Sequence, residues 1–400
     1  MRGNSLRCFS TVFIVLVSVA LVGSKAQAQK TLLALYNFTG GSDGGGPNNG
    51  MAVDALGNFY GTTWTGGISS PVGGNGVVFE LSPDGDRHWT EKVLYSFGFG
   101  IDGHSPTSGV VFDASSNLYG TTTEGGQYEG GTVYELSPTG GGNWTEKIIH
   151  SFGGFGDGGY AQAGLVIDSR GNLFGTTVLG GVEDAGVAFE LSPSTDGNWT
   201  ETVLQNFTWE PTGTLVMDQK GNLYGTSAGY AGGGSVYELT PTQNGWEMNI
   251  IYGFLGPPDG SYPASGVTFG KNGHLYGVTE MGGSYGIGTA FELVPSATGT
   301  WTENQLYSFG QKKSDPIYPT FPLVVAPSKG LWGVGGSGTN CGGLFLLSSG
   351  TSGWTEKKVY SSTCQGLQFG GVSLQNSAGH LFGPAGGFTL GGGIIYEFIP

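Results

Sequence analysis

Short apolar runs alternate with glycine-rich and polar turns along most of the chain. The clearest example contains four such runs, at residues 165–168, 173–177, 187–191 and 199–207. Runs this short, rich in β-branched and aromatic side chains, predict strands rather than helices. Four strands in succession, joined by tight turns, predict one antiparallel propeller blade.

An aromatic and glycine segment in the second strand shows that this unit is repeated. It reads Asn-Phe-Tyr-Gly-Thr-Thr at 58–63, and related segments follow at 117–122, 172–177, 222–227, 274–279, 330–334 and 380–383. The seven copies recur about every 54 residues, near the length of known propeller repeats. The sequence therefore predicts seven units of one architecture.

The two ends of the chain predict how the units close into a ring. Strands one to three occur seven times, but the fourth strand, which opens on tryptophan, occurs only at Trp89, Trp144, Trp199, Trp246, Trp301 and Trp354. Residues 31–38 match residues 90–97 in register, so the N-terminal segment can supply the missing strand beside 394–398. We expect an all-β, seven-bladed β-propeller with four antiparallel strands per blade, formed by residues 29–400 as one domain and closed by this N-terminal strand.

Residues 1–28 have the pattern of a secretory signal peptide. Arg2 and Arg7 precede an apolar stretch at 12–22, and Ala26-Gln27-Ala28 is a small-residue cleavage site. We therefore expect a secreted, extracellular or periplasmic protein, cleaved near Ala28, with no membrane span in the mature chain. Removing the leader leaves 12 basic against 30 acidic residues, a net charge of −18, which excludes nucleic acid and anionic membranes as partners.

Two cysteines remain after cleavage. Cys341 just precedes the third strand of the sixth unit, and Cys364 just follows the fourth. In an antiparallel hairpin the start of one strand faces the end of the next, so the two thiols can approach bonding distance. We predict a disulfide between them, the alternative being two free thiols in an exported chain.

The repeated phrases together resemble a known family. Gly-Asn-Leu-Tyr-Gly-Thr-Thr, the following glycine-rich loop, Tyr-Glu-Leu-Ser-Pro, Trp-Thr-Glu and Leu-Tyr-Ser-Phe are similar to the GloVer tandem-repeat family of exported bacterial proteins, over nearly all of the mature chain. The resemblance implies no established activity and no catalytic residue. Members often continue into a cell-surface anchor, whereas this sequence stops within its last unit, which implies free secretion.

Two sets of loops are expected on one face of the propeller, around its central channel. They contain the candidate ligand-binding residues Asp43, Asp102, His104, Glu124, Tyr128, Asp157, Asp259 and Tyr285. Carboxylates there could bind sugar hydroxyl groups or a cation such as Ca²⁺. Turn chemistry alone also explains the repeated Asp-Gly pairs. We expect no obligatory cofactor, a glycan or protein as the ligand, and a monomer.

A catalytic site should break the sevenfold repetition, because a reaction needs one site. The residues that differ from the repeat are His104, His150, which replaces a tyrosine, Glu183 with Asp184, and Lys312 with Lys313. Adjacent carboxylates such as Glu183 and Asp184 usually point apart, and the five histidines lack metal-ligand spacing. The sequence therefore predicts no catalytic residue and no metal site. The tryptophans recur once per unit, which indicates packing between blades rather than sugar stacking.

Three functions remain open from the sequence. The leading prediction is a non-enzymatic extracellular binding or scaffold module for carbohydrate or protein. The first alternative is a carbohydrate-active enzyme, either a glycoside hydrolase or a polysaccharide lyase, with carboxylates on the channel face. The second is a structural or adhesive exoprotein. An enzyme would bring acidic side chains from different blades together, and a structural protein would not.

Overall fold

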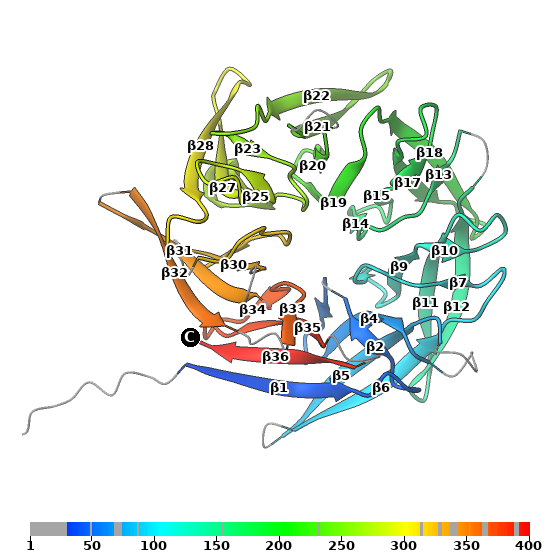
Figure 1. Ribbon diagram of the computed structural model, residues 1–400. Helices are drawn as coiled ribbons and strands as arrows, with labels where there is room; N and C mark the ends of the chain where they lie inside the picture. The colour runs from blue at the N-terminus through cyan, green and yellow to red at the C-terminus, as the bar shows by residue number, and fades with distance from the viewer. Residues whose placement is uncertain are drawn as a thin grey trace, which may run out of the picture.

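The computed structural model of the protein is a seven-bladed β-propeller (Figure 1). It describes residues 30–48, 50–67, 74–85, 88–153, 156–229, 233–312, 315–326, 330–336, 342–351, 353–361, 367–387 and 392–400. The predicted architecture is confirmed, since the sheets are antiparallel and arranged around a central opening. Within these described ranges, no helix is long and apolar enough to cross a membrane.

Each of the first four blades runs from an inner strand outward in sequence order. Blade 1 contains β3 (Ala52–Val53), β4 (Phe59–Thr65), β5 (Val77–Gly85) and β6 (His88–Ser96), with β2 (Gly45–Pro47) also paired to β4. Blade 2 contains β8 (Val111–Phe112), β9 (Leu118–Thr122), β11 (Thr132–Gly140) and β12 (Asn143–Ser151). Blade 3 contains β14 (Val166–Ile167), β15 (Leu173–Thr176), β17 (Val187–Pro193) and β18 (Trp199–Asn206). Blade 4 contains β19 (Pro211–Met217), β20 (Leu223–Ser227), β21 (Ser235–Thr242) and β22 (Gly245–Gly253).

The last three blades repeat the pattern, and the final one includes the N-terminus. Blade 5 contains β24 (Thr268–Phe269), the short 3-10 helix η1 (Lys271–Gly273), β25 (Leu275–Thr279), β27 (Thr289–Pro295) and β28 (Trp301–Ser308). Blade 6 contains β29 (Val324–Val325), β30 (Gly330–Gly335), β31 (Gly343–Gly350) and β32 (Gly353–Ser361). Blade 7 contains β34 (Leu374–Gln375), β35 (Leu381–Gly387), β36 (Gly393–Ile399) and β1 (Thr31–Phe38), with β33 (Leu367–Phe369) also paired to β35.

Strand β1 closes the ring as the sequence predicted. It pairs antiparallel with β36, from Thr31 opposite Ile399 to Phe38 opposite Gly393, with one irregularity between Ala34 and Tyr36 (Figure 1). The outer strand of blade 7 therefore comes from the start of the chain and the other strands from its end. Closure of this kind leaves no open sheet between the first and last blades.

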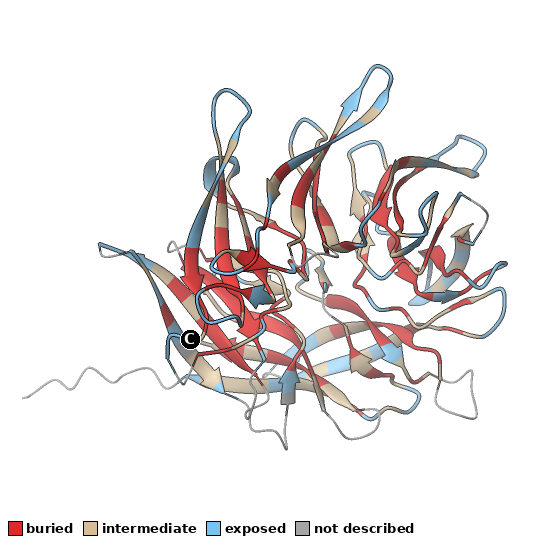
Figure 2. Cartoon of the chain, turned by 45° about the horizontal axis from the view of Figure 1, so that its top comes forward, coloured by how far each residue is buried: buried red, intermediate tan, exposed pale blue. Residues whose placement is uncertain are grey.

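Aromatic side chains fill the space between adjacent blades. At six boundaries a phenylalanine at the end of the outer strand, or just beyond it, contacts an aromatic ring on the third strand of the next blade. In blade 7, Phe369 of β33 makes the equivalent contact with Tyr396. The ring centroids lie 5.0 to 5.1 Å apart in Phe38–Phe79, Phe97–Tyr134, Phe152–Phe189, Phe207–Tyr237, Phe254–Phe291, Phe309–Phe345 and Phe369–Tyr396. Burial is accordingly concentrated in the middle strands, and exposed residues lie at the outer hairpins and loops (Figure 2).

The glycine of the repeated second-strand segment makes room for these rings. A Cβ on Gly61 would lie 2.7 Å from Phe79 Cζ, closer than real Cβ contacts allow. The tryptophans of the fourth strands also pack across blades, as in Trp199 against Tyr119 at 5.8 Å and Trp301 against Tyr224 at 5.9 Å. The repeated glycine of the second strand and the repeated tryptophan of the fourth strand thus both contribute to packing between blades.

Cys341 and Cys364 both lie outside the described residues. The predicted disulfide between them stays a prediction.

Candidate functional site

A cavity of about 580 Å³ lies where the inner strands of several blades meet. Its walls are mostly backbone, small side chains and hydroxyl groups, as at Thr107, Gly164, Thr212 and Ser265. Among the described residues that line it, Glu210 is the one acidic side chain. The cavity is therefore nearly neutral, and the predicted convergence of carboxylates from different blades does not occur on its walls.

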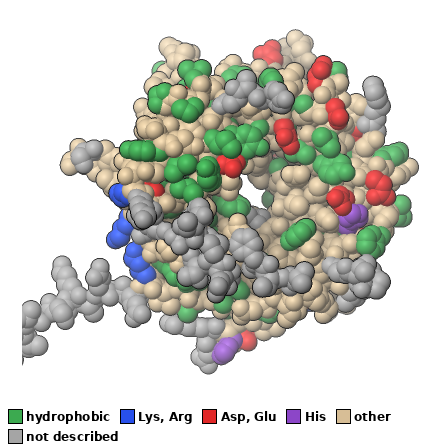
Figure 3. Space-filling model, viewed as in Figure 1, with side chains coloured by type: hydrophobic (Ala, Val, Ile, Leu, Met, Phe, Trp, Pro, Cys, Tyr) green, Lys and Arg blue, Asp and Glu red, His purple; other side chains and the backbone are tan. Residues whose placement is uncertain are grey.

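The exposed aromatic side chains of the described residues lie in loops on one face, except that of Trp64, which lies near the end of β4 where such a loop begins. These loops join the second strand of a blade to its third, or the fourth strand to the next blade. The residues are Trp64, Phe99, Tyr128, Trp209, Tyr262, Tyr285 and Tyr318, each between 38% and 59% exposed. Figure 3 shows hydrophobic side chains in patches around the central opening of the face viewed there. Exposed rings suit the apolar faces of sugar rings, as they do in other ligand sites.

One histidine and one glutamate form an ion pair on this face. Strand β7 (Gly103–His104) lies in the linker into blade 2 and pairs with β10 (Glu124–Gly125), which places His104 directly opposite Glu124. His104 Nδ1 lies 3.3 Å from Glu124 Oε2, and the two side chains are 15% and 48% exposed. We call His104 and Glu124 the rim pair.

The rim pair lies beside the cavity and an exposed ring. Thr107, which lines the cavity, has its hydroxyl oxygen 3.0 Å from that of Thr123, the neighbour of Glu124. The ring of Phe99 lies 5.8 Å from the imidazole of His104. A ligand bound at the mouth of the cavity can therefore contact both the ring of Phe99 and the rim pair, whose side chains can transfer a proton.

The equivalent positions in blades 3 and 5 carry no titratable pair. Strands β13 (Gly158–Gly159) and β16 (Leu179–Gly180) place Gly159 opposite Leu179. Strands β23 (Gly260–Ser261) and β26 (Met281–Gly282) place Ser261 opposite Met281. The rim pair thus breaks the repetition of the ring, which is the property expected of a catalytic group.

The four predicted aspartates lie farther out, at the junctions between outer strands. Asp43, Asp102 and Asp259 each accept a hydrogen bond from a tyrosine hydroxyl group of the preceding outer strand. The donors are Tyr36 at 3.2 Å, Tyr95 at 3.1 Å and Tyr252 at 3.1 Å. The fourth, Asp157, lies 3.5 Å from His150 Nε2 instead. None of the four lines the central cavity.

A glutamate of the next blade faces each of these aspartates, and the sequence analysis missed this pairing. Burial, together with the negative charge of the aspartate, raises the pKa of the glutamate to about 7 in Glu91, Glu146, Glu201 and Glu303. A fifth pair, Asp315 with Glu356, repeats the arrangement, and burial likewise raises the pKa of Glu356. We call these the junction carboxyl pairs. Because they recur, they are part of the repeated architecture.

Of the remaining predicted residues, Tyr128 lies close to the rim pair in the sequence and the others belong to other blades. Tyr285 is exposed at 55% in blade 5, whereas Tyr128 is equally exposed in the loop that follows Glu124. Glu183 is exposed, and Asp184 accepts a hydrogen bond from the Gly180 amide at 2.9 Å, so that carboxylate stabilises its own loop. The two do not form a catalytic carboxylate pair.

Solved structures with the same fold come from several kinds of protein. A protein from Lactobacillus plantarum is 15% identical, with 88% of each chain covered and a TM-score of 0.52. A 6-phosphogluconolactonase candidate from Bacteroides fragilis is 11% identical over 94% of this chain and 99% of that one, with a TM-score of 0.50. A polysaccharide lyase is 11% identical over 88% of this chain and 89% of that one, with a TM-score of 0.52. No curated protein matches the chain in sequence.

The expectation of a non-enzymatic binding or scaffold module is wrong. The propellers that share the fold include a polysaccharide lyase and two 6-phosphogluconolactonase candidates, which favour the enzymatic alternative. The expectation depended on the uniformity of the repeat, which the rim pair interrupts. At this low identity the likeness itself shows the fold alone and identifies no catalytic residue.

The family resemblance seen in the repeated phrases is confirmed. The sequence matches the Gloeobacter/Verrucomicrobia repeat over residues 24–229 and again over residues 210–400. The two stretches together include all seven blades. The chain therefore belongs to the Gloeobacter/Verrucomicrobia repeat family.

Proposed function

We propose that this protein is an exported carbohydrate-active enzyme, a glycoside hydrolase or polysaccharide lyase, that acts on the face bearing the rim pair. The observation that carries the proposal is the pairing of His104 with Glu124 at 3.3 Å, at a position where the other blades compared carry neutral residues. Cleavage of a glycosidic bond by either route requires a side chain that moves a proton. The exposed aromatic rings around it supply surfaces on which sugars can stack.

The geometry gives each member of the pair a role. Glu124 is about half exposed and can reach a bound chain, whereas His104 is mostly buried and holds the carboxylate in place. In hydrolysis Glu124 would donate a proton to the glycosidic oxygen as the C–O bond breaks and water adds to the sugar carbon. His104 would stabilise the carboxylate that Glu124 then carries. The mature chain is strongly acidic, and the cavity lining contributes no basic side chain among its described residues. These charges favour an uncharged glycan over a polyuronate, which the protein would repel. Because elimination requires a uronate, they also favour the hydrolase over the lyase.

The test is turnover by the mature protein on a panel of neutral polysaccharides and polyuronates. New reducing ends report hydrolysis, and the ultraviolet absorbance of unsaturated uronate reports elimination. We expect activity on a neutral glycan, and we expect Glu124→Gln to lower kcat by about 100-fold or more, since general acid–base groups typically contribute 10²–10⁴-fold.

The matched control is Glu183→Gln, an exposed glutamate in the corresponding loop of blade 3. It removes the same charge from the same face and should leave kcat unchanged. Full activity in the Glu124 variant, or no turnover on any polymer of the panel, would contradict the proposal.

A further inference from the structure

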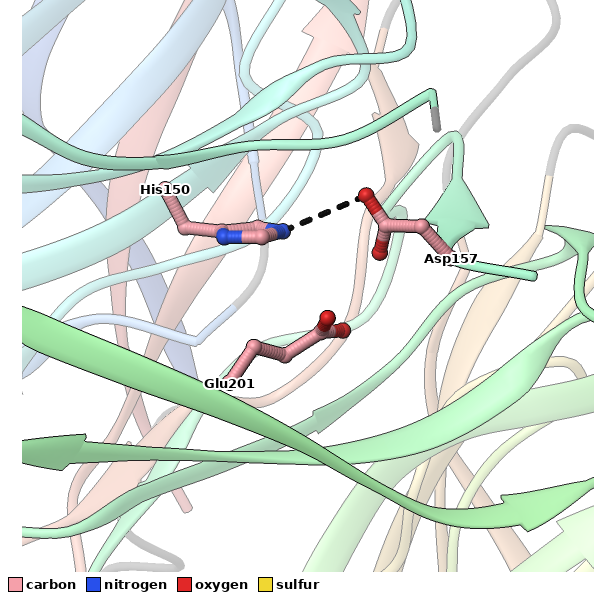
Figure 4. Close-up of side chains that lie close together, drawn as sticks. All are labelled: His150, Asp157 and Glu201. Atoms are coloured by element: carbon pink, nitrogen blue, oxygen red, sulfur yellow. Dashed lines mark ion pairs between the residues drawn. The ribbon is translucent and has the colours of Figure 1, made fainter. Parts of the chain in front are cut away.

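Three ligand-type side chains converge at the junction of blades 2 and 3, away from the rim pair. His150 comes from β12, Asp157 from the linker before β13, and Glu201 from β18. One ligand atom from each lies within 4.8 Å of the other two. Figure 4 shows the three side chains directed toward one another, with an ion pair between His150 and Asp157.

The exchange of one side chain distinguishes this junction from its counterparts. Tyr36, Tyr95, Tyr252 and Tyr307 occupy the position of His150 at the other junction carboxyl pairs, and each donates a hydroxyl hydrogen bond to the aspartate. Tyrosine completes a hydrogen-bonded pair, whereas imidazole supplies the nitrogen that transition metals prefer. The same architecture therefore gains a metal-ligand atom at one place only among the described junctions.

Two atoms of the cluster lack the hydrogen bonds that would otherwise explain their burial. His150 Nε2 and Glu201 Oε1 are both buried, and neither has a hydrogen-bond partner. The same glutamate oxygen is also unpartnered in Glu91, Glu146 and Glu356, so the imidazole nitrogen is the atom that distinguishes this junction. The 3.5 Å separation of His150 Nε2 from Asp157 Oδ2 is too long for a good hydrogen bond. It suits two ligands of one ion, because two bonds of about 2.0–2.2 Å at a tetrahedral angle place the ligand atoms roughly 3.3–3.6 Å apart.

The junction of blades 5 and 6 shows that this architecture accepts a positive charge. At the boundary of blades 5 and 6, Lys312 Nζ lies 3.4 Å from Glu356 Oε2, beside Asp315. The ammonium group there offsets the charge of two carboxylates. The junction of blades 2 and 3 has two carboxylates and a histidine instead. The imidazole of His150 is held edge-on against Phe152, with ring centroids 4.6 Å apart, which fixes its orientation.

We propose that His150, Asp157 and Glu201 form a binding site for one divalent transition-metal ion of the Zn²⁺ class. The three protein ligands come from two blades and a linker, so the ion would tie the outer strands of blades 2 and 3 together. One nitrogen and two carboxylate ligands favour Zn²⁺ over Ca²⁺, which prefers an all-oxygen site.

The experiment measures Zn²⁺ binding to the full mature chain, purified without a polyhistidine tag and treated with chelator. Isothermal titration and metal analysis after dialysis should give one ion per chain, and added Zn²⁺ should raise Tm. His150→Tyr restores the residue found at the other junctions and is therefore expected to fold. It should weaken Zn²⁺ binding by more than about 100-fold, because even the loss of an outer-shell partner weakens metal sites 10–100-fold.

A gain-of-site variant keeps the proposal testable should the first variant fold poorly. Tyr95→His places imidazole beside Asp102 and Glu146 and should add a second Zn²⁺ per chain. Equal Zn²⁺ binding by the wild type and His150→Tyr, no binding by the wild type, or no additional ion in the Tyr95→His variant would each overturn the proposal.

Discussion

Replacing Phe38 with alanine is expected to lower the free energy of unfolding by about 3–5 kcal/mol. Phe38 is 4% exposed at the end of β1, and its ring lies 5.0 Å from Phe79 of blade 1. It therefore joins blade 7 to blade 1 through the strand that closes the ring. Chemical denaturation of the mature protein at neutral pH, followed by tryptophan fluorescence, measures the change.

Two further variants separate ring closure from ordinary packing. Ala34→Ser changes an exposed position of the same strand and should alter stability by less than about 0.5 kcal/mol. Phe152→Ala removes the equivalent ring contact, Phe152–Phe189 at 5.1 Å, between two blades that the chain connects directly. Both phenylalanine variants should unfold more easily, but only Phe38→Ala should expose β1 to protease before global unfolding. Wild-type stability in Phe38→Ala would show that β1 does not close the ring.

The fold could be predicted because the residues that make the contacts between blades recur in every repeat. Residues such as Gly61 and Trp199 recur at fixed positions because every blade meets its neighbour in the same way. One tryptophan-led fourth strand is missing from the seven repeats, and residues 31–38 match the fourth strand at residues 90–97. These two observations were enough to predict which segment pairs with β36. Ring closure follows from counting strands, and it does not require knowledge of any side-chain contact.

The rim pair could be predicted only in part. His104 and Glu124 were both placed on one face, and His104 was recognised as different from the repeat. Their direct opposition depends on the two-residue strands β7 and β10, which form within glycine-rich loops. Segments this short have no apolar periodicity, so the register between them is not visible in the sequence.

The junction carboxyl pairs were missed for a different reason. Each pair joins a linker aspartate to the glutamate of the next Trp-Thr-Glu phrase, about one repeat later, and only the packing of two blades brings them together. A signal for it exists in the sequence. Where the glutamate position holds Met248 or Leu32, the preceding linker also lacks an aspartate. The linker aspartate and the glutamate are therefore present together or absent together in each repeat, which predicts that the two residues are in contact.

These pairs make stability depend on pH in an unusual direction. Glu146 faces Asp102, Tyr95 and the buried Tyr134, and burial with the charge of Asp102 raises its pKa to about 7. The folded state thus keeps the carboxyl group neutral at a pH where the unfolded chain ionises it. A raised pKa of this kind contributes stability that is fully present below pH 4.5 and is lost as pH rises toward about 7. The raised pKa values of Glu91 and Glu303 make stability fall with rising pH in the same way.

We therefore expect the mature protein to lose stability between about pH 4.5 and 7.5, by roughly 1 kcal/mol for each of these partly exposed glutamates. Glu146→Gln imitates the neutral carboxyl group. It should raise the free energy of unfolding by about 1 kcal/mol at pH 8 and change it little at pH 4.5. Denaturation curves of both proteins at the two pH values measure the difference.

The control is Glu247→Gln, an exposed glutamate on β22 of blade 4, whose junction has no carboxyl pair. It should give the same small change at both pH values. Asp168 does not disturb this comparison. Hydrogen bonds from Asn172 and Arg170 outweigh its burial and lower its pKa. Its contribution to the free energy of unfolding is therefore lost only below about pH 4, outside the range from pH 4.5 to 8. If Glu146→Gln destabilises the protein equally at pH 4.5 and 8, the pKa of Glu146 is not raised in the folded state.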